Sequence, residues 1–496
     1  MKKWLSLLLS LTMAFSLSSC LGVPESSGSS AGGASDSSSV QDSQDSQSGQ
    51  TDTSDSTGSS ASDSASDSQG GDSSTDTEEE VKGFVTTYST FNPETDSPYK
   101  MTDVVKTDLM WDTATLFAQV PETKEVGAIN LGENITSFKF KSVAYNAKAE
   151  TWVFGAIGMP NAVKYPKPAQ GYPAVILIHG GAMYVNVDWI NYWTNKGFVA
   201  LAFDVFGNQL DANGAKAVNS EGGPGENDGP LNDNPDNVAN SWMYHSITNA
   251  ILCNNLLRAN ADVNSQQIGV TGISWGGVVT NVLSGVDKRI ASFAPVYGAG
   301  YLYEDEAWAS RGGYYWNANA TDKQRWIDTF DPSTYLAYST KPMLFVSGID
   351  DVWFSPKIRM KSAQLAKGKV FYSQRSDLGH GDCWRNENTY EIYAFFLHTL
   401  LGQDTVSQIG TASLQDAGTY DKIYFSGNTN VKFSTAKVMY TTSTDANSHS
   451  WQFTSRYITI SNGWCTVPKG ITAYCIEYIH TDIYETYKLS TPIYFV

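Results

Sequence analysis

Five runs of consecutive apolar residues constrain the fold of this chain more than any other feature. They are YPAVILIHG (172–180), FVALAFDVF (198–206), IGVTGIS (268–274), ASFAPVYG (291–298) and PMLFVSG (342–348). Strands without polar alternation are typical of a parallel sheet that is covered on both faces. Helical patterns separate or follow these runs, among them SWMYHSITNAILCNNLLRA, SPKIRMKSAQLAKG and ENTYEIYAFFLHTLLG. Strands alternating with helices predict an α/β fold with a doubly wound, mostly parallel sheet.

The pattern changes after Gly402. Residues 403–496 hold short runs rich in Thr, Tyr and Val, which are separated by Gly, Asn, Asp and Pro. This pattern predicts a small all-β domain, most simply an immunoglobulin-like sandwich. Such a domain either binds polysaccharide or only packs against the preceding domain, and packing is the simpler expectation.

The start of the chain has the features of an export signal. Two lysines precede an apolar run of 14 residues from Trp4 to Leu17, which is too short to span a bilayer comfortably. The run ends in Leu17-Ser18-Ser19-Cys20, which resembles the lipobox of bacterial lipoproteins, whose cysteine is diacylated and becomes the new N-terminus. An ordinary secretory signal that happens to contain a cysteine is the alternative. We expect a protein held by Cys20 on the outer side of a bacterial cell membrane.

A linker follows the signal. Residues 21–81 are mostly Ser, Asp, Gly, Gln and Thr, and they contain 13 acidic residues and no Lys or Arg. Such a segment buries too little apolar surface to offset the entropy of ordering it, so we expect it to be disordered. A flexible chain of this length has a root-mean-square span on the order of 45 Å. The predicted segments are a signal peptide with lipobox (1–20), a linker (21–82), an α/β domain (83–402) and a β-sandwich (403–496).

The charge and the cysteines of the chain indicate which partners, disulfides and metal sites to expect. The net charge of −18 comes largely from the linker, and no basic patch stands out elsewhere, so we expect no nucleic-acid partner. Beyond the lipobox, an exported protein could pair some of its four cysteines, most simply Cys465 with Cys475. None of them has metal-ligand spacing with a histidine, so we expect no metal site.

The segment IGVTGISWGGVV predicts a nucleophile. Ser274 lies between Gly272 and Gly276, after an apolar strand and before the helical pattern WGGVVTNVLSG. A Gly-x-Ser-x-Gly turn between strand and helix exposes the serine hydroxyl, and its glycines permit the close approach of strand and helix. Glycine-rich turns are common, but this context favours a nucleophile.

A serine nucleophile needs a base, and the sequence has six histidines. Four of them lie in predicted helices or in the predicted β-domain: His245, His398, His449 and His480. His179 ends a strand and opens HGGAM, where the backbone is of more use than the ring. His380, in SDLGHGDCW, lies in a loop between a strand and the last helix, which makes it the best candidate.

The third member of a triad is expected between serine and histidine in the chain. FVSGIDDVWFSP places Asp350 or Asp351 after an apolar strand, where a carboxylate can accept a hydrogen bond from the imidazole. Adjacent side chains of a strand point to opposite sides, so only one of the two can readily face the histidine.

The HGGAM turn predicts an oxyanion hole. The backbone N–H groups of Gly181 and Ala182, together with that of Trp275 after the nucleophile, would stabilise the charge of a tetrahedral intermediate.

Three longer blocks carry a family resemblance: HGGAMYVNVDWINYWTNKGFVALAFD, NAILCNNLLRANADVNSQQIGVTGISWGG and RWIDTFDPSTYLAYSTKPMLFVSGIDDVWFSP. They resemble bacterial acetylxylan esterases of the α/β-hydrolase superfamily, which are related to dienelactone hydrolases and to the catalytic domains of prolyl-oligopeptidase-type peptidases. The resemblance covers roughly residues 130–402, and the trailing β-domain resembles a module found in some of these enzymes. It implies an α/β-hydrolase catalytic domain over 83–402.

The resemblance also implies roles for single residues. Ser274 and His380 match the nucleophile and the base of the family. Many relatives carry the acid three residues after the glycine that ends the strand, and counting from Gly348 this is Asp351. Asp350 would then cap the following turn or meet solvent. The glycine run after His179 is shorter than usual in the family, because Ala182 and Met183 replace glycines.

The expected reaction is ester hydrolysis through an acyl-enzyme, without a metal or an organic cofactor. The resemblance implies an acylated plant cell-wall polysaccharide or oligosaccharide as the substrate. The aromatic stretch GYYWNANATDKQRW (313–326) would either stack on sugars above the site or pack as a surface cap.

Two other functions remain open from the sequence. A serine peptidase of the prolyl-oligopeptidase kind would use the same triad, but it normally needs charged residues that hold a peptide terminus. A non-catalytic cell-surface binding lipoprotein would have a decayed triad, whereas all members are present here. The sequence leaves the oligomeric state open.

Overall fold

A computed structural model describes residues 110–496, apart from 128, 130, 227–228, 306–307, 309–311, 383–387, 407–408, 427–432, 445–450 and 482–484. All described residues belong to one compact unit, Glu78–Val496. The predicted signal peptide, Cys20, the whole predicted linker and residues 83–109 of the predicted α/β domain lie outside the described residues. None of the described helices combines the length and the apolar character needed to cross a bilayer.

The regular elements of the α/β part alternate as the apolar runs predict. Its strands are β1 (Thr123–Glu125), β2 (Ile135–Ser142), β3 (Thr151–Gly158), β4 (Tyr172–Ile178), β5 (Val199–Phe203), β6 (Asn208–Leu210), β7 (Lys216–Val218), β8 (Val263–Ile273), β9 (Ser292–Val296), β10 (Met343–Gly348) and β11 (Val370–Arg375). Its helices are α1 (Thr113–Phe117), α2 (Val187–Thr194), α3 (Trp242–Ala259), α4 (Trp275–Val286), α6 (Tyr314–Asn317), α7 (Ala320–Phe330), α8 (Ser333–Leu336), α9 (Pro356–Leu365) and α10 (Tyr390–Leu401).

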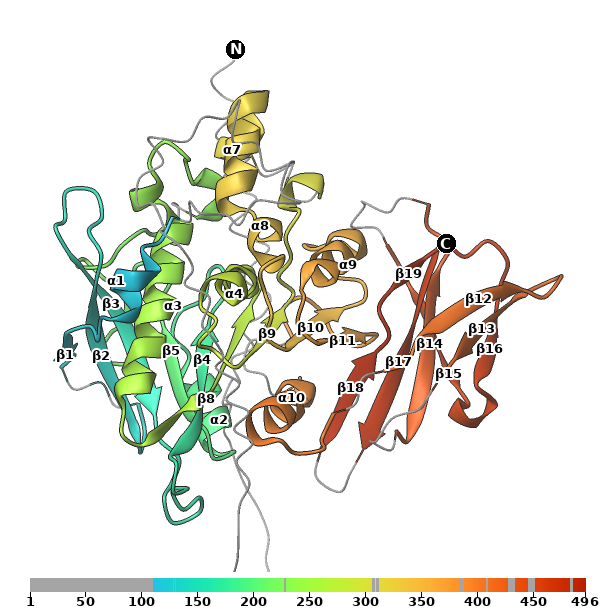
Figure 1. Cartoon of the computed structure of the whole chain (residues 1–496), viewed down its shortest axis with the longest axis horizontal. Helices are drawn as coiled ribbons and strands as arrows, with labels where there is room; N and C mark the ends of the chain where they lie inside the picture. Colours follow the sequence, from blue (N-terminus) through green and yellow to red (C-terminus); the bar gives the residue numbers. More distant parts are fainter. Residues whose placement is uncertain are drawn as a thin grey trace, which may run out of the picture. The chain divides into compact units, whose positions relative to one another are not determined.

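The central sheet has the strand order β1-β2-β3-β5-β4-β8-β9-β10-β11 over the α/β part (Figure 1). The strands from β5 to β11 pair in parallel, whereas β1, β2 and β3 are antiparallel to their neighbours. Every residue of β4, β5, β9 and β10 is buried, as expected for strands covered on both faces. This order, with the crossover at β4 and β5, is that of an α/β-hydrolase, and the predicted mostly parallel sheet is confirmed.

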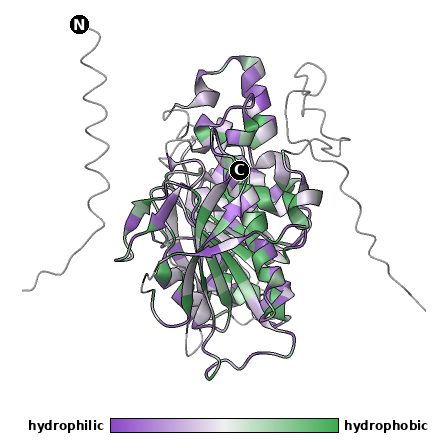
Figure 2. Cartoon of the chain, turned by 90° about the vertical axis from the view of Figure 1, so that its left-hand side faces the viewer, coloured by the Kyte–Doolittle hydropathy of each residue, from purple (hydrophilic) through white to green (hydrophobic). Residues whose placement is uncertain are grey.

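Helices cover both faces of this sheet. A Cβ added at Gly269 of β8 would meet Phe396 of α10 at 2.8 Å, whereas one added at Gly272 would meet Thr280 of α4 at 2.6 Å. Positions three apart on a strand point to opposite sides, so α10 and α4 lie on opposite faces. Helix α2 packs on α10 through the rings of Trp193 and Phe396, and α3 contacts α4. Figure 2 shows hydrophobic residues concentrated on the central strands between these layers.

Strands dominate the region after Gly402, which ends α10 in the left-handed conformation (φ 67°). They are β12 (Ala412–Asp416), β13 (Asp421–Phe425), β14 (Thr435–Thr441), β15 (Thr454–Ile458), β16 (Trp464–Val467), β17 (Ala473–Thr481), β18 (Thr486–Ser490) and β19 (Tyr494–Phe495). Strands β12, β13 and β16 form a separate sheet. The immunoglobulin-like topology and the boundary at 402/403 stay predictions.

The remaining C-terminal strands extend the central sheet. Its order continues from β11 as β18-β17-β14-β15, and β18 joins β11 antiparallel at Tyr372 and Ser490 (Figure 1). Alternate residues of β17 face two different cores. Ile476 and Tyr478 pack with β12, β13 and β16, whereas Cys475 packs with Ile349 from the α/β part.

The two nearby cysteines therefore serve two cores. Cys465 lies in the core between the two C-terminal sheets, and Cys475 lies in the core beneath β10. Both are buried with free thiols, so the expected pair Cys465–Cys475 is wrong. Proximity in sequence was a poor guide because the two side chains belong to cores on different sides of the sheet that contains β17.

Candidate active site

The predicted nucleophile lies in a sharp turn between β8 and α4. Ser274 has φ 56° and ψ −115°, a conformation that is rare for a residue with a side chain. The flanking glycines are sterically required. A Cβ at Gly276 would lie 2.0 Å from the carbonyl oxygen of Ile178, and one at Gly272 would lie 2.1 Å from that of Gly276. The sequence pattern thus corresponds to a strained turn that lifts the serine hydroxyl out of the backbone.

The predicted base meets this hydroxyl. His380 lies in the loop after β11, and its Nε2 atom is 3.1 Å from Ser274 Oγ. Its Nδ1 atom is 2.9 Å from Asp351 Oδ2. The side chain of Asp351 is fully buried, so an Nδ1–H that donates to this carboxylate is the stable tautomer, and Nε2 is left to accept the serine proton. The structure brings Ser274, His380 and Asp351 together in the order that the sequence predicts.

The backbone holds the carboxylate of Asp351 in place. Its Oδ1 accepts hydrogen bonds from the N–H groups of Trp353 at 2.8 Å and Phe354 at 2.9 Å. Burial would raise the pKa of this carboxyl, but the hydrogen bond and charge of His380, followed by the charge of Arg359, outweigh it and lower the pKa. The group is therefore an anion over the whole range in which His380 can act as a base.

The neighbouring aspartate has a different partner. Asp350 Oδ1 accepts a hydrogen bond from the backbone N–H of Phe453, at 2.8 Å, in the C-terminal region. Asp350 is exposed, which agrees with the expectation that it meets solvent, but its hydrogen bond to a residue 103 positions further along the chain was not expected. The preference for Asp351 over Asp350 as the partner of His380 agrees with this geometry.

The predicted oxyanion hole is met only in part. Gly181 lies against the residue after the nucleophile, since an added Cβ would be 2.9 Å from Trp275 Cδ1. The N–H of Ala182 instead donates to Glu226 Oε1 at 2.5 Å, and Ala182 has φ 59°. Including Ala182 among the donors is therefore not supported, because a carboxylate already occupies its N–H. Gly181 and Trp275 are left as the candidate donors.

The buried ring of His179 contacts the HGG turn (179–181) that carries Gly181. It is 2% exposed, its Nδ1 is 2.9 Å from Gly180 O, and its Nε2 is 3.2 Å from Asp204 Oδ2. The ring thus joins the HGG turn to the residue after β5. From the sequence, only the backbone of this turn was expected to have a role.

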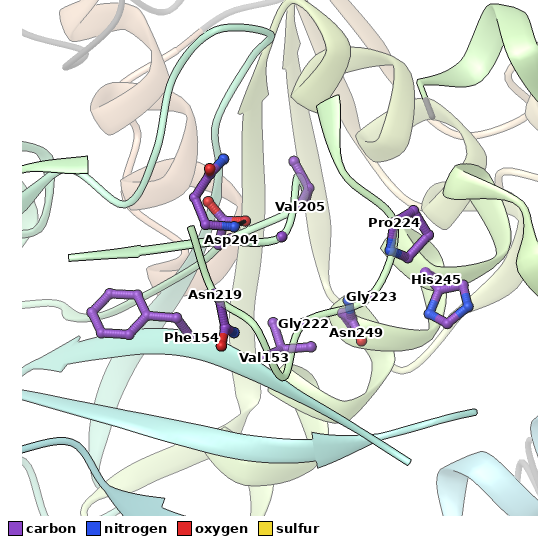
Figure 3. Close-up of a pocket in the computed structure, with 12 residues that line it drawn as sticks. Val153, Phe154, Asp204, Val205, Asn219, Gly222, Gly223, Pro224, His245 and Asn249 are labelled. Atoms are coloured by element: carbon purple, nitrogen blue, oxygen red, sulfur yellow. Dashed lines mark hydrogen bonds between the residues drawn. The ribbon is translucent and has the colours of Figure 1, made fainter. Parts of the chain in front are cut away.

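A small cavity lies next to Asp204. It measures about 10 Å³, the space of a single water molecule, and Figure 3 shows Asp204, Asn219 and His245 around it. Burial lowers the pKa of His245 to about 4, and its Nε2 lies 3.0 Å from Ala239 O. His245 is a packed, neutral histidine, as its position in a predicted helix suggested.

Aromatic rings surround the triad. The ring of Trp275 is 4.7 Å from that of Trp308, which is 5.7 Å from Trp353. Trp353 in turn lies 6.1 Å from the His380 ring, and Tyr297 lies 4.6 Å from it. The rings of Trp275, Trp308 and Trp353 form a row that runs from the residue after the nucleophile to the ring of the base, and we call this row the tryptophan wall. The segment 313–326 contributes none of these three rings.

Two residues that support the site were not predicted from the sequence. Arg359 of α9 is buried and donates to the carbonyl groups of Gly348 and Ile349, at 2.8 and 3.0 Å, just before the acid. Tyr297 donates its hydroxyl to Gly379 O, at 2.5 Å, next to the base. Arg359 stands in the polar pattern KIRMK, which reads as an exposed helix face, so no local signal marks it.

The described residues contain no group of His, Cys, Asp and Glu side chains arranged to hold a metal ion. What they do contain is a serine whose proton can pass to a histidine oriented by a buried carboxylate. This arrangement performs nucleophilic acyl transfer.

Comparison with known proteins points in the same direction. Residues 117–304, which include Ser274, match the family described as acetyl xylan esterase (AXE1). No curated protein matches the chain. Similar solved structures include the acetyl xylan esterase from Paenibacillus sp. R4, with 20% identity over 60% of this chain and 96% of that chain and a TM-score of 0.45.

Two further solved structures show weaker likeness. The acetyl xylan esterase 1 from Thermoanaerobacterium sp. JW/SL YS485 has 15% identity over 58% of this chain and 91% of that chain, with a TM-score of 0.42. The acylaminoacyl peptidase of Pyrococcus horikoshii has 14% identity over 54% of this chain and 42% of that chain, with a TM-score of 0.40. Likeness at these TM-scores carries no information on the substrate of this chain. The family match and the geometry around Ser274 together identify the chain as a serine hydrolase of the esterase kind, similar over residues 117–304 to acetyl xylan esterases.

Proposed function

We propose that the protein removes acetyl groups from acylated plant cell-wall polysaccharide or oligosaccharide. The observation that carries this proposal is the hydrogen-bonded chain Ser274–His380–Asp351, in a protein whose residues 117–304 match the acetyl xylan esterase family. The geometry supplies the chemistry of acyl transfer, and the family match favours an acetylated sugar as the alcohol part.

The roles of the residues follow from the geometry. Ser274 Oγ attacks the ester carbonyl while His380 Nε2 takes its proton. The oxyanion accepts hydrogen bonds from the N–H groups of Gly181 and Trp275, at the positive end of helix α4. His380 then returns the proton to the leaving alcohol. A water molecule, deprotonated by the same nitrogen, releases the acyl group from Ser274.

The tryptophan wall supports a small acyl group. Trp275 follows the nucleophile directly, and the rings of Trp308 and Trp353 continue from it toward His380. Rigid rings at this spacing favour an acetyl group over a long acyl chain, because a long chain needs an open channel beside the nucleophile.

The location is part of the same proposal. We infer that Cys20 carries a lipid and that the Ser- and Asp-rich linker separates the enzyme from the membrane surface. The lipobox-like Leu17-Ser18-Ser19-Cys20 and the acidic composition of 21–81 support this arrangement. An esterase held in this way would act on polysaccharide outside the cell.

A panel of four substrates tests the proposed function. We expect the wild-type protein to hydrolyse a short-chain aryl ester and to release acetate from acetylated xylan, and to leave an aminoacyl amide intact. A long-chain aryl ester is expected to react more slowly than the acetyl ester. Ser274→Ala is the control and is expected to abolish every activity. A preference for the amide would replace the esterase by a peptidase, and a preference for long chains would exclude the small acyl site.

A further inference from the structure

The loop that carries His380 is held by charged side chains from the C-terminal strands. Glu477 lies on β17 and its side chain is fully buried. Its two carboxylate oxygens accept hydrogen bonds from Ser376, one from the backbone N–H at 3.0 Å and one from the hydroxyl at 3.1 Å. Ser376 is the first residue after β11 and lies four positions before His380. A carboxylate from the C-terminal region therefore fixes the start of the loop that presents the base.

Two lysines complete this contact. Lys437 lies opposite Glu477 in the β14–β17 pairing, and its Nζ donates to the Ser376 hydroxyl at 2.8 Å and lies 3.7 Å from Glu477 Oε2. Lys488 of β18 pairs with Asp377, the next residue of the loop. Burial would raise the pKa of Asp377, but its hydrogen bond to Lys488 and the charge of Arg375 outweigh this and lower it. The carboxylate of Asp377 is therefore charged at neutral pH.

The far end of the loop is held from the α/β part. Tyr297 donates to Gly379 O at 2.5 Å, and its ring lies 4.6 Å from the His380 ring. A Cβ at Gly348 would lie 1.8 Å from Leu378 O, so the end of β10 also touches this loop. Residues 376–380 are thus held at one end by the C-terminal strands and at the other by β9 and β10. The position of His380 depends on both contacts.

We propose that Glu477 is a positioning residue for His380, and hence that the C-terminal strands form part of the working hydrolase rather than a separate module packed against it. The proposal rests on the proposed function, since it assumes that His380 is the base. Glu477 touches no reacting atom and acts through Ser376. A polar residue is needed there because two donors of the loop must be accepted in a fixed direction, which apolar packing does not supply.

The experiment compares three variants by steady-state hydrolysis of 4-nitrophenyl acetate. Glu477→Ala removes both acceptors. Glu477→Gln keeps one acceptor for the Ser376 N–H, and Ser376→Ala removes only the hydroxyl link. The matched control is Glu485→Gln. Glu485 also joins the C-terminal region to the α/β part, through Lys196 at 2.6 Å, but this contact does not involve the His380 loop.

A misplaced base slows chemistry without weakening substrate binding. We expect Glu477→Ala to lower kcat by about 10- to 100-fold, the range expected for a displacement of up to 1 Å, with an unchanged KM. Glu477→Gln is expected to recover part of the loss, and Ser376→Ala to show a smaller loss. Glu485→Gln is expected to keep wild-type kcat. The rate at which a fluorophosphonate labels Ser274 is expected to fall in parallel with kcat, because it depends on the same base.

The possible outcomes separate this inference from the proposed function. A wild-type protein without esterase activity removes the basis of both. With an active wild type, a folded Glu477→Ala variant with wild-type kcat overturns the inference, as does a loss matched by Glu485→Gln. If the alanine variant fails to fold, Ser376→Ala decides: wild-type kcat and labelling rate in that variant would overturn the inference, and a reduced kcat at constant KM supports it.

Discussion

Two adjacent carboxylates of this chain have separate tasks. Asp351 bonds to His380 and to two backbone N–H groups, whereas Asp350 bonds to the backbone of Phe453. Both residues lie beyond the end of β10, so the turn that follows the strand, and not strand alternation, directs the two side chains to different partners. The sequence indicated that only one of the pair could serve the histidine, but it contained no sign of the partner of the other.

Substitution of each aspartate by asparagine distinguishes their tasks. Asp351→Asn replaces the acceptor for Nδ1–H by a group that can favour the wrong tautomer of His380, and we expect a loss of kcat of up to about 10⁴-fold. Asp350→Asn keeps an oxygen for the Phe453 N–H, and we expect a far smaller loss. Steady-state kinetics on an aryl acetate measure both. Equal losses would mean that both carboxylates support the histidine, and the reverse order would assign the role to Asp350.

The elements around the nucleophile were the most predictable part of the molecule. The apolar runs at 172–180, 198–206, 291–298 and 342–348 correspond to β4, β5, β9 and β10, because burial on both faces leaves a continuous apolar signal. The run at 268–274 corresponds to β8, which begins earlier, at Val263, in a polar stretch that gave no such signal. The antiparallel strands β1, β2 and β3 were not predicted: β1 and β2 mix polar and apolar residues, whereas β3 (TWVFGAIG) is an apolar run that was missed.

The approach of β4 to α4 gives a prediction at this scale. Gly276→Ala would place a Cβ 2.0 Å from Ile178 O. The atoms that this Cβ would meet belong to the backbone, so no side-chain rotation can relieve the clash. We expect the free energy of unfolding to fall by about 1–3 kcal/mol, as for overpacking in general, and the esterase activity to fall with it. Gly127→Ala is the matched control because no atom lies within 4 Å of an added Cβ there. Chemical denaturation compares the two, and a fully stable, active Gly276→Ala protein would contradict the steric argument.

At the scale of the whole molecule, the contacts between the α/β part and the C-terminal strands lay beyond sequence reasoning. Glu477 and Lys437 occur in ordinary strand patterns, where charged residues usually face solvent. Their burial follows only from the joining of β18 to β11, a pairing between residues more than a hundred positions apart. The composition change after Gly402 indicated strands, but it contained no information on what those strands contact.

The anchor is predicted to be separable from catalysis. The triad is assembled from residues 274–380, far along the chain from the predicted anchor, so Cys20→Ala is expected to release the protein from the membrane and to leave its esterase activity unchanged. Fractionation of cells followed by an activity assay of each fraction measures this. A variant that stays in the membrane fraction would show that something other than a lipid on Cys20 holds the protein there.

The pairing of β11 with β18 also matters while the chain folds. An outer strand without a neighbour exposes a row of N–H and C=O groups that can recruit another polypeptide. Here the neighbour that covers β11 is Thr486–Ser490, which follows β11 in the sequence by more than a hundred residues. Until β18 has paired, the partly folded sheet has a bare edge with which the same edge of a second copy can pair. We therefore expect β18 to limit self-association of the folding chain.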